Sequence, residues 1–267
     1  MKPGTPAIGT LFLIPTPLDF GCLLPDATPD PISRWLPSDT LTTASRLTHW
    51  ITENAKSTRA FLKRVDSLHS LAAPLQAQNI TELPRQVHKK GDHTPATAGD
   101  AEARALLAPL LMGHDIGLVS EAGMPAIADP GSSIVRAAHA MGAPVHPMTG
   151  PISLMLALAA SGLNGQNFAF VGYVPQSVDE RAKRLRELET LSLKTGQTQI
   201  LIETPYRNAA LLSSLIQSLH PHTRLAVSCA LSLAAQTTRS ALIADWKAHA
   251  LQQALPLEAP AVFLIGR

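Results

Sequence analysis

The sequence lacks the marks of a secreted or membrane-bound protein. Only two of its 267 residues are cysteines, Cys22 and Cys229, and they form no CxxC pair. Such sparse cysteine favours a reducing compartment over a disulfide framework. No apolar run approaches the roughly 20 residues that a membrane-spanning helix needs, and Pro15 and Pro17 interrupt the short apolar run near the N-terminus. We therefore expect a soluble, cytoplasmic protein with no membrane contact.

Charge and aromatic residues are also scarce. Aromatic residues make up 4% of the chain, so the core must consist mostly of Leu, Ala, Val and Ile. The net charge is +2, whereas strongly basic nucleic-acid-binding proteins usually carry more. This charge permits an anionic partner without requiring one.

Several well-known catalytic motifs are missing. The chain has no G-x-G-x-x-G after its first apolar run, no phosphate-binding P-loop and no G-x-S-x-G, so it lacks the motifs of dinucleotide-binding proteins, NTPases and α/β-hydrolases. His220 and His222 flank a proline without an H-E-x-x-H helix or a nearby cysteine pair. We predict no metal site.

What the sequence does contain is an alternation of short apolar runs and helical patterns, typical of an α/β fold. The predicted strands cover residues 11–14, 47–52, 116–120, 145–148, 168–173, 199–203, 225–229 and 261–265, and the predicted helices include 57–68, 100–112, 133–141 and 152–163. At this length two domains are expected, which we place at residues 1–148 and 149–267.

Local signals add detail to this outline. Residues 18–40 are rich in Pro and Asp and predict a loop with one helical turn at most. Residues 152–163 are apolar all round, which predicts a buried helix, and Thr149 stands where it would cap that helix. Ser177 and Glu180 fit a capping box before a further helix.

Five loops follow predicted strands and are rich in Gly, Pro and small polar residues. In open parallel sheets, ligands bind at such carboxyl-terminal loops. Taken singly, each loop is more simply explained as a turn or a helix start. The segments are IPTP (14–17), VSEAGMPAIADPG (119–131), PMTGPIS (147–153), FVGYVP (170–175) and IETPYR (202–207).

In this order, the five segments resemble those of the tetrapyrrole-methylase-type (class III) S-adenosylmethionine-dependent methyltransferases. The similarity is greatest to the branch that methylates a cytidine ribose 2′-hydroxyl in small-subunit ribosomal RNA. That branch typically reads VPTPIGN, EDTR, VSDAGTPxxxDPG, PLPGPxA, GFLP and ESxHR. The resemblance runs from about Leu11 to Gly266, and its most specific part is VSEAGMP…DPG followed by TGP.

The resemblance implies two α/β domains, each with a mostly parallel or mixed sheet flanked by helices, and S-adenosylmethionine in a cleft between them. S-adenosylhomocysteine would be the product, and family members commonly form homodimers. Glu121, Asp129 and Glu203 are candidates to assist removal of the hydroxyl proton, and the sequence does not choose among them. The implied cofactor-binding residues are Pro15, Thr16, Pro17, Ser120, Glu121, Ala122, Gly123, Met124, Asp129, Thr149, Gly150, Pro151, Cys229, Ala230 and Leu231.

Charged positions depart from the ribosomal branch, which leaves the substrate open. The EDTR motif is replaced by residues 53–56 (ENAK), and the late ARELTK-like segment is replaced by residues 229–234 (CALSLA). A methylase of porphyrin- or corrin-type small molecules and a non-catalytic cofactor- or RNA-binding protein are therefore alternatives to an enzyme acting on ribosomal RNA or the small ribosomal subunit. Candidate substrate-contacting cations are Lys56, Lys89, Lys90, Arg181, Arg184 and Arg207.

Overall fold

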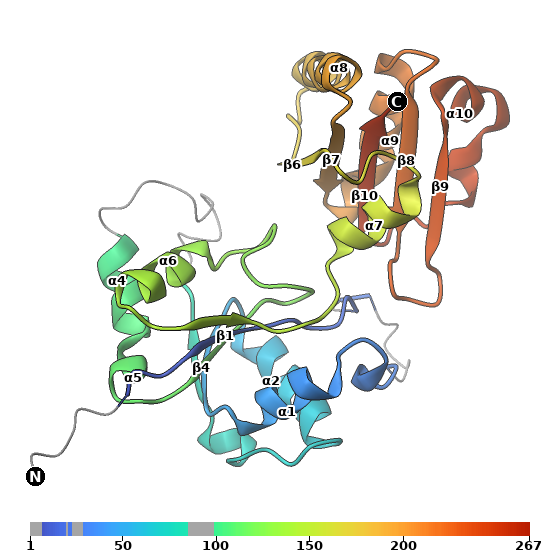
Figure 1. The fold of residues 1–267 in the computed structure, drawn as a ribbon. Coiled ribbons are helices and arrows are strands. Elements are labelled where there is room, and N and C mark those ends of the chain that lie inside the picture. The colour runs from blue at the N-terminus through green and yellow to red at the C-terminus, as the bar shows by residue number, and fades with distance from the viewer. Residues whose placement is uncertain (1–6, 20, 23–28, 85–98) are drawn as a thin grey trace, which may run out of the picture. The chain divides into compact units, whose positions relative to one another are not determined.

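The computed structural model describes residues 7–19, 21–22, 29–84 and 99–267. The chain divides into two compact units, Met1–Pro151 and Ile152–Arg267, coloured blue to green and yellow to red in Figure 1. The boundary predicted from the sequence was after residue 148.

In unit 1 the described strands form a parallel sheet in the order β3-β2-β4-β1-β5. Because all neighbouring strands are parallel, their carboxyl ends reach the same edge of the sheet. The strands are β1 (Leu11–Ile14), β2 (His49–Thr52), β3 (Asn79–Glu82), β4 (Ile116–Val119) and β5 (Val145–Pro147).

Helices cover both faces of this sheet. One face packs through Phe12, Ile14 and Trp50 onto residues of α1 (Ser38–Arg46) and α2 (Ala55–Asp66). The other face packs onto a second set of helices, visible around β1 and β4 in Figure 1. That set consists of α4 (Gly99–Leu106), α5 (Ala108–Leu111) and α6 (Ser132–Ala140), and the 3-10 turns of the unit are Ile32–Arg34 and Leu75–Ala77.

Unit 2 contains a mixed sheet in the order β6-β7-β10-β8-β9. Strands β6 and β7 are parallel, whereas β10 is antiparallel to both of its neighbours and β9 is antiparallel to β8. The strands are β6 (Phe168–Gly172), β7 (Thr198–Glu203), β8 (Arg224–Cys229), β9 (Thr237–Leu242) and β10 (Ala261–Gly266).

The main core of unit 2 lies between this sheet and α8, α9 and α10, where Phe263 and Trp246 are fully buried. The helix α7 packs on β10, β8 and β9. The helices are α7 (Ser153–Ser161), α8 (Val178–Thr195), α9 (Asn208–Ser218) and α10 (Ile243–His249), with 3-10 turns at Pro205–Arg207 and Leu251–Ala254. The prediction of α/β units with parallel or mixed sheets is confirmed.

Two predictions about α7 were wrong. The helix begins at Ser153 after an N-cap at Ile152, and the Thr149 carbonyl instead accepts a hydrogen bond from Thr40 Oγ1 at 2.8 Å. The helix is also not buried all round, because Met155 is 36% and Leu156 is 42% exposed. It therefore packs on the sheet through one side, which its uniformly apolar sequence could not indicate.

Other local predictions also needed correction. Residues 38–40, which were predicted to be loop, belong to the full helix α1 (Ser38–Arg46). The predicted 100–112 helix breaks at Leu107, since Pro109 lacks the N–H that would continue the hydrogen-bond ladder. Ser177 precedes α8 as expected but makes no side-chain capping bond. No helix in the part of the chain that the structure describes is long and apolar enough to cross a membrane.

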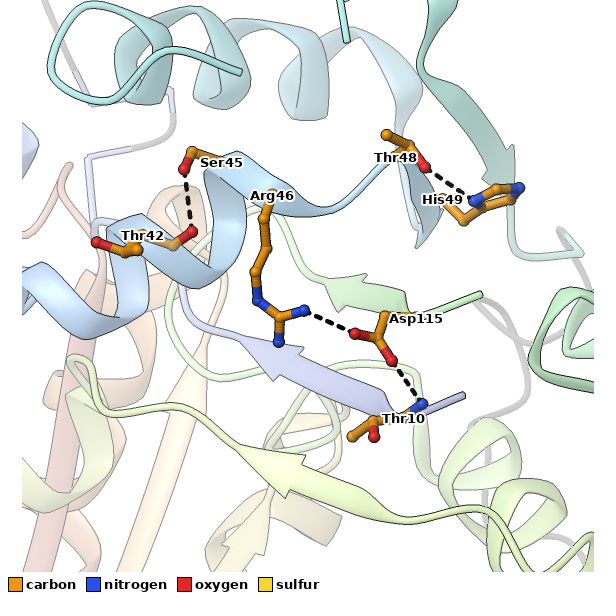
Figure 2. A network of polar contacts seen from close by, with 7 residues as sticks. All are labelled: Thr10, Thr42, Ser45, Arg46, Thr48, His49 and Asp115. Atoms are coloured by element: carbon orange, nitrogen blue, oxygen red, sulfur yellow. Dashed lines mark hydrogen bonds and ion pairs between the residues drawn. The ribbon is translucent and has the colours of Figure 1, made fainter. Parts of the chain in front are cut away.

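The amino edge of the unit 1 sheet carries a network of paired polar groups. Asp115, just before β4, accepts hydrogen bonds from Arg46 Nη1 at 2.7 Å and from the Thr10 backbone N–H at 2.8 Å (Figure 2). The His49 ring stacks on His114 with 4.7 Å between ring centroids. These contacts tie the starts of β1, β2 and β4 together.

Candidate functional site at the carboxyl ends of the strands

The carboxyl edge of the unit 1 sheet brings two predicted cofactor-binding loops into direct contact. Thr16, after β1, and Gly123, after β4, form an antiparallel bridge with N···O distances of 2.9 and 3.1 Å. The Thr16 hydroxyl also donates to the Ser120 carbonyl at 3.3 Å. The loop after β1 is therefore fixed against the loop after β4, although residues 16 and 120 lie far apart in sequence.

The third loop of unit 1, residues 149–151, packs against the first through a glycine. A Cβ atom at Gly150 would lie 2.3 Å from Cγ and 2.5 Å from Cβ of Pro15. Such distances leave no room for any side chain, so Gly150 allows the close approach of the two backbones. Pro15, Thr16 and Pro17 are all buried, whereas the Thr149 side chain is exposed.

The loop after β4 is held in an unusual backbone conformation. Gly123 has φ +80° and Gly131 has φ +138°, where glycine is strongly favoured. Two alanines between them, Ala126 and Ala128, have φ +64°, which costs free energy for residues with a Cβ. This tightly turned segment carries Asp129 back toward the sheet edge.

Three carboxyl groups from two loops gather at this edge. Glu53 follows β2, Glu121 follows β4, and Asp129 lies in the turned segment. Burial, aided by the charges of Asp129 and Glu121, raises the pKa of Glu53 from 4.5 to about 8. Burial also raises the pKa of Asp129 to about 6, against the lowering effect of a hydrogen bond with Ser120. One Glu53 oxygen, Oε1, is buried and makes no hydrogen bond within the described residues.

A cavity of about 330 Å³ lies between the loops after β1 and β4 and the start of α2, and Glu121 is the one of these three carboxyls that lines it. That volume lies at the lower end of the range for small-molecule sites, roughly 300–1,000 Å³. Asn54 Nδ2 donates to Glu121 Oε1 at 2.9 Å in the wall, and Arg64 pairs with Asp19 at 2.9 Å. The lining includes Thr16, Pro17, Asp19, Asn54, Lys56, Phe61, Arg64, Ser120 and Glu121.

The predicted site residues of unit 2 share an edge of their own sheet. Ala261 at the start of β10 pairs with Glu203 on one side and Cys229 on the other, so both strands end at this edge. Glu203 Oε1 accepts a 2.7 Å bond from Arg207 and a 2.8 Å bond from the Thr204 N–H. Cys229, Ala230 and Leu231 are buried, and Ala230 has φ +53°.

The predicted substrate-contacting cations are scattered. Lys56 lines the unit 1 cavity, while Lys89 and Lys90 lie outside the described residues. On α8, Arg181 donates to Ser214 Oγ at 2.9 Å and to the Gln176 carbonyl at 3.1 Å, and Arg184 forms a 3.3 Å ion pair with Glu187.

Sequence reasoning missed Glu53 as a site residue. Its position in the ENAK segment was noted only as a departure from EDTR, but its burial beside Asp129 depends on contacts between β2 and the loop after β4. Within the described residues, no group of three or more His, Cys, Asp or Glu side chains is arranged so that it could hold a metal ion. The edge therefore offers close backbone approach and proton-holding carboxyls beside a cavity.

Comparisons with known proteins agree with this architecture. The sequence model of the family described as Tetrapyrrole (Corrin/Porphyrin) Methylases matches residues 48–246. Two relatives are each called "Ribosomal RNA small subunit methyltransferase I". The one from Pseudomonas aeruginosa is 33% identical over 150 residues, 55% of this chain and 52% of the relative. The one from Bacillus subtilis is 30% identical over 162 residues, which make up 59% of this chain and 54% of the relative. The chain spans about half the length of these relatives.

Solved structures share the fold at low sequence identity. The methyltransferase CobJ aligns with a TM-score of 0.53 at 17% identity, over 97% of this chain and 94% of that one. Uroporphyrin III C-methyltransferase from Thermus thermophilus aligns with a TM-score of 0.51 at 13% identity, over 97% and 98%. At this level of identity the alignment establishes the shared two-unit α/β fold and leaves the acceptor open.

Proposed function

Because this chain belongs to the tetrapyrrole (corrin/porphyrin) methylase family, we propose that it is an S-adenosylmethionine-dependent methyltransferase acting on ribosomal RNA. The acceptor is the ribose 2′-hydroxyl of a cytidine in the small-subunit RNA, as the resemblance in sequence motifs implies. The observation that carries the proposal is the name shared by three relatives, "Ribosomal RNA small subunit methyltransferase I", at 30–39% identity. An RNA substrate of this kind agrees with a cytoplasmic location.

The residues at the carboxyl edge of unit 1 fit S-adenosylmethionine in both shape and charge. The contact of Gly150 with Pro15 and the Thr16–Gly123 bridge hold the three loops close together, and backbone N–H and C=O groups at strand ends suit the amino acid moiety of the cofactor. The cofactor carries a positive sulfonium, and the carboxylates of Glu121 and Asp129 provide complementary charge, whereas a pKa of about 8 keeps Glu53 mostly protonated near neutral pH. When bound, S-adenosylmethionine supplies the methyl group that is transferred.

The chain's own residues would contribute orientation and proton removal. Loops fixed to one another hold reactants in line, which is the largest contribution that a methyltransferase can make. Asp129 is the best placed of the three predicted carboxyls to accept the hydroxyl proton. Its pKa of about 6 leaves it ionised near neutral pH while making it a stronger base than an ordinary Asp. Glu203 is less suited, since its Oε1 already accepts bonds from Arg207 and Thr204.

Two measurements test the proposal. Calorimetry should detect binding of S-adenosylmethionine and S-adenosylhomocysteine, and mass mapping of ribosomal RNA from a deletion strain should reveal one missing ribose methyl group. Absence of cofactor binding would exclude an enzyme of this family's type. Cofactor binding with an unchanged RNA map would point to a porphyrin- or corrin-type acceptor. Asp129→Asn should lower kcat, since it removes the base and keeps the side-chain shape.

The homodimer implied by the resemblance remains part of the proposal. Strand β6 lies at the edge of the unit 2 sheet and exposes Phe168 (40%) and Phe170 (37%) on one face. Two aromatic side chains on an edge strand offer apolar surface that a second copy can bury. Sedimentation should show a dimer that Phe168→Asp with Phe170→Asp converts to a monomer, and a monomeric wild type would contradict it.

A further inference from the structure

Both tyrosines of the chain lie at one edge of the unit 2 sheet. Tyr173 directly follows β6 and Tyr206 lies in the 3-10 turn after β7, and these two strands are parallel neighbours (Figure 1). Tyr206 is 81% exposed and Tyr173 is 58% exposed. Two exposed aromatic side chains at one sheet edge offer surface that a partner can bind.

Arg207 lies against the ring of Tyr206. Its guanidinium carbon lies 5.2 Å from the centroid of the Tyr206 ring, within the range of a cation–π contact. A 2.7 Å bond to the buried Glu203 carboxylate holds the guanidinium in place. That hydrogen bond is the main cause that raises the pKa of Arg207, and the proximity of Tyr206 and Tyr173 adds to it.

One donor of Arg207 has no acceptor among the described residues. Arg207 Nε is buried and makes no hydrogen bond within the described residues. A buried donor left unpaired costs free energy, so a ligand oxygen that reaches it would be bound favourably. Oriented cations beside exposed aromatic rings are the combination that binds single-stranded nucleic acid, where bases stack on the rings and phosphates meet the charge.

We propose that Tyr173, Tyr206 and Arg207 form a stacking platform for unpaired nucleotides of the substrate RNA. The inference rests on the proposed function and adds to it residues that bind the RNA. The platform lies at the sheet edge where β8 ends with Cys229, next to the stretch predicted to face the cofactor. A folded duplex offers no free base faces, so the platform selects single-stranded segments.

The test is fluorescence anisotropy with a short labelled single-stranded RNA and the full-length protein. Tyr206→Ala should weaken binding about tenfold, the effect of losing one base–aromatic stack. Tyr206→Phe should bind as the wild type does, while Tyr206→Leu should bind as weakly as the alanine variant, because Leu keeps apolar bulk without a π-face. Arg207→Gln should reduce the dependence of affinity on salt by about one ionic contact, and the tyrosine variants should leave it unchanged.

A second cation–aromatic pair provides a matched control. In unit 1 the guanidinium carbon of Arg34 lies 5.1 Å from the Trp35 ring, and Trp35→Ala should leave RNA affinity unchanged. Equal losses from Trp35→Ala and Tyr206→Ala, or full affinity in Tyr206→Leu, would overturn the platform. If the wild type binds RNA and every Tyr206 variant binds it equally well, only the platform is overturned. Wild-type protein that binds S-adenosylmethionine but no RNA overturns both the platform and the RNA substrate.

Discussion

At the amino edge of the unit 1 sheet, Asp115 accepts hydrogen bonds from Arg46 and from the Thr10 N–H, whereas at the carboxyl edge Glu53 keeps a buried oxygen without a partner among the described residues. Both edges belong to the same parallel strands and both carry acidic side chains. The carboxyl edge also holds a cavity of about 330 Å³ and two alanines at positive φ, Ala126 and Ala128.

Within one sheet, the two edges therefore differ in what their charged side chains can do. Paired charges at the amino edge satisfy each other and have little left to offer a ligand. At the carboxyl edge, burial raises the pKa values of Glu53 and Asp129, so both carboxyls hold their protons to higher pH than usual. Carboxyls with raised pKa values at an edge that also holds a cavity make this edge a candidate functional site.

The largest effect is expected from Gly150→Val, which acts on the carboxyl edge. The new Cβ would lie 2.3 Å from Pro15, so the loop after β5 must move away from the loop after β1. Overpacking of this kind costs about 1–3 kcal/mol of stability. Calorimetry should show no measurable S-adenosylmethionine binding. Gly165→Val, at a glycine whose Cβ would meet nothing within 4 Å, should bind normally. Undiminished affinity in Gly150→Val would show that the TGP loop is not at the cofactor.

Glu53→Gln should produce the next largest effect. In the folded protein the pKa of Glu53 is about 8, above its ordinary 4.5, so the folded state holds the proton to higher pH than the unfolded chain. The wild type therefore loses stability as pH rises from 4.5 through about 8. Glu53→Gln has no carboxyl to ionise, so it should not show that loss. Across this pH range its free energy of unfolding should rise above that of the wild type by on the order of 2 kcal/mol, a value reduced for partial solvent exposure.

Thermal unfolding of both proteins across this pH range measures the difference. Parallel pH profiles for the wild type and Glu53→Gln would mean that Glu53 ionises normally. The carboxyl edge would then lose its distinguishing electrostatics.

A smaller effect is expected from breaking the ion pair at the amino edge. Arg46 is 49% and Asp115 is 31% exposed, so solvent screens their attraction. A double-mutant cycle with Arg46→Met and Asp115→Asn should give a coupling of about 0.2–1 kcal/mol that weakens with salt. Cofactor affinity should not change. A large coupling, or a loss of cofactor binding in Arg46→Met, would erase the distinction between the two edges.

The smallest effect should come from His49, also at the amino edge. Burial, with a contribution from His114, lowers the pKa of His49 below its ordinary 6.5. The unfolded chain then binds the proton more readily, so this group's contribution to stability is present above 6.5 and is lost as pH falls below it. His49→Gln should flatten that slight acid-side decline in thermal unfolding. A steeper loss of stability at acid pH in His49→Gln would mean that folding does not lower the pKa of His49. The two edges thus respond to pH with opposite sign.

Much of the fold was predictable because apolar runs mark buried strands directly. The strand at residues 116–119 is buried at every position, and its apolar sequence predicted it. Strands β3 (NITE) and β9 (TTRSAL) were missed, since both are polar and only partly buried. The helix α1 was missed because its burial of Leu41 and Ala44 depends on packing against the sheet, which residues 38–46 alone do not reveal.

The candidate site was predictable in its loops and not in its charges. Glycine and proline motifs located the segments around Thr16, Gly123 and Gly150, which the structure brings to one edge. The motif could not identify Glu53, whose raised pKa arises from burial and from neighbours distant in sequence. Nor could it indicate that Arg207 would contact Tyr206 and Glu203 together. Local sequence indicates where the backbone must turn tightly or approach closely, whereas the electrostatic environment of a side chain depends on tertiary packing.

The central claim is that the carboxyl edges serve methyl transfer to ribosomal RNA. Its most direct test is incubation of the purified protein with methyl-labelled S-adenosylmethionine and fractionated cellular RNA and metabolites. The account predicts label in small-subunit ribosomal RNA, recovered as a 2′-O-methylated cytidine. Label in a tetrapyrrole-type small molecule, or in no fraction at all, would contradict it.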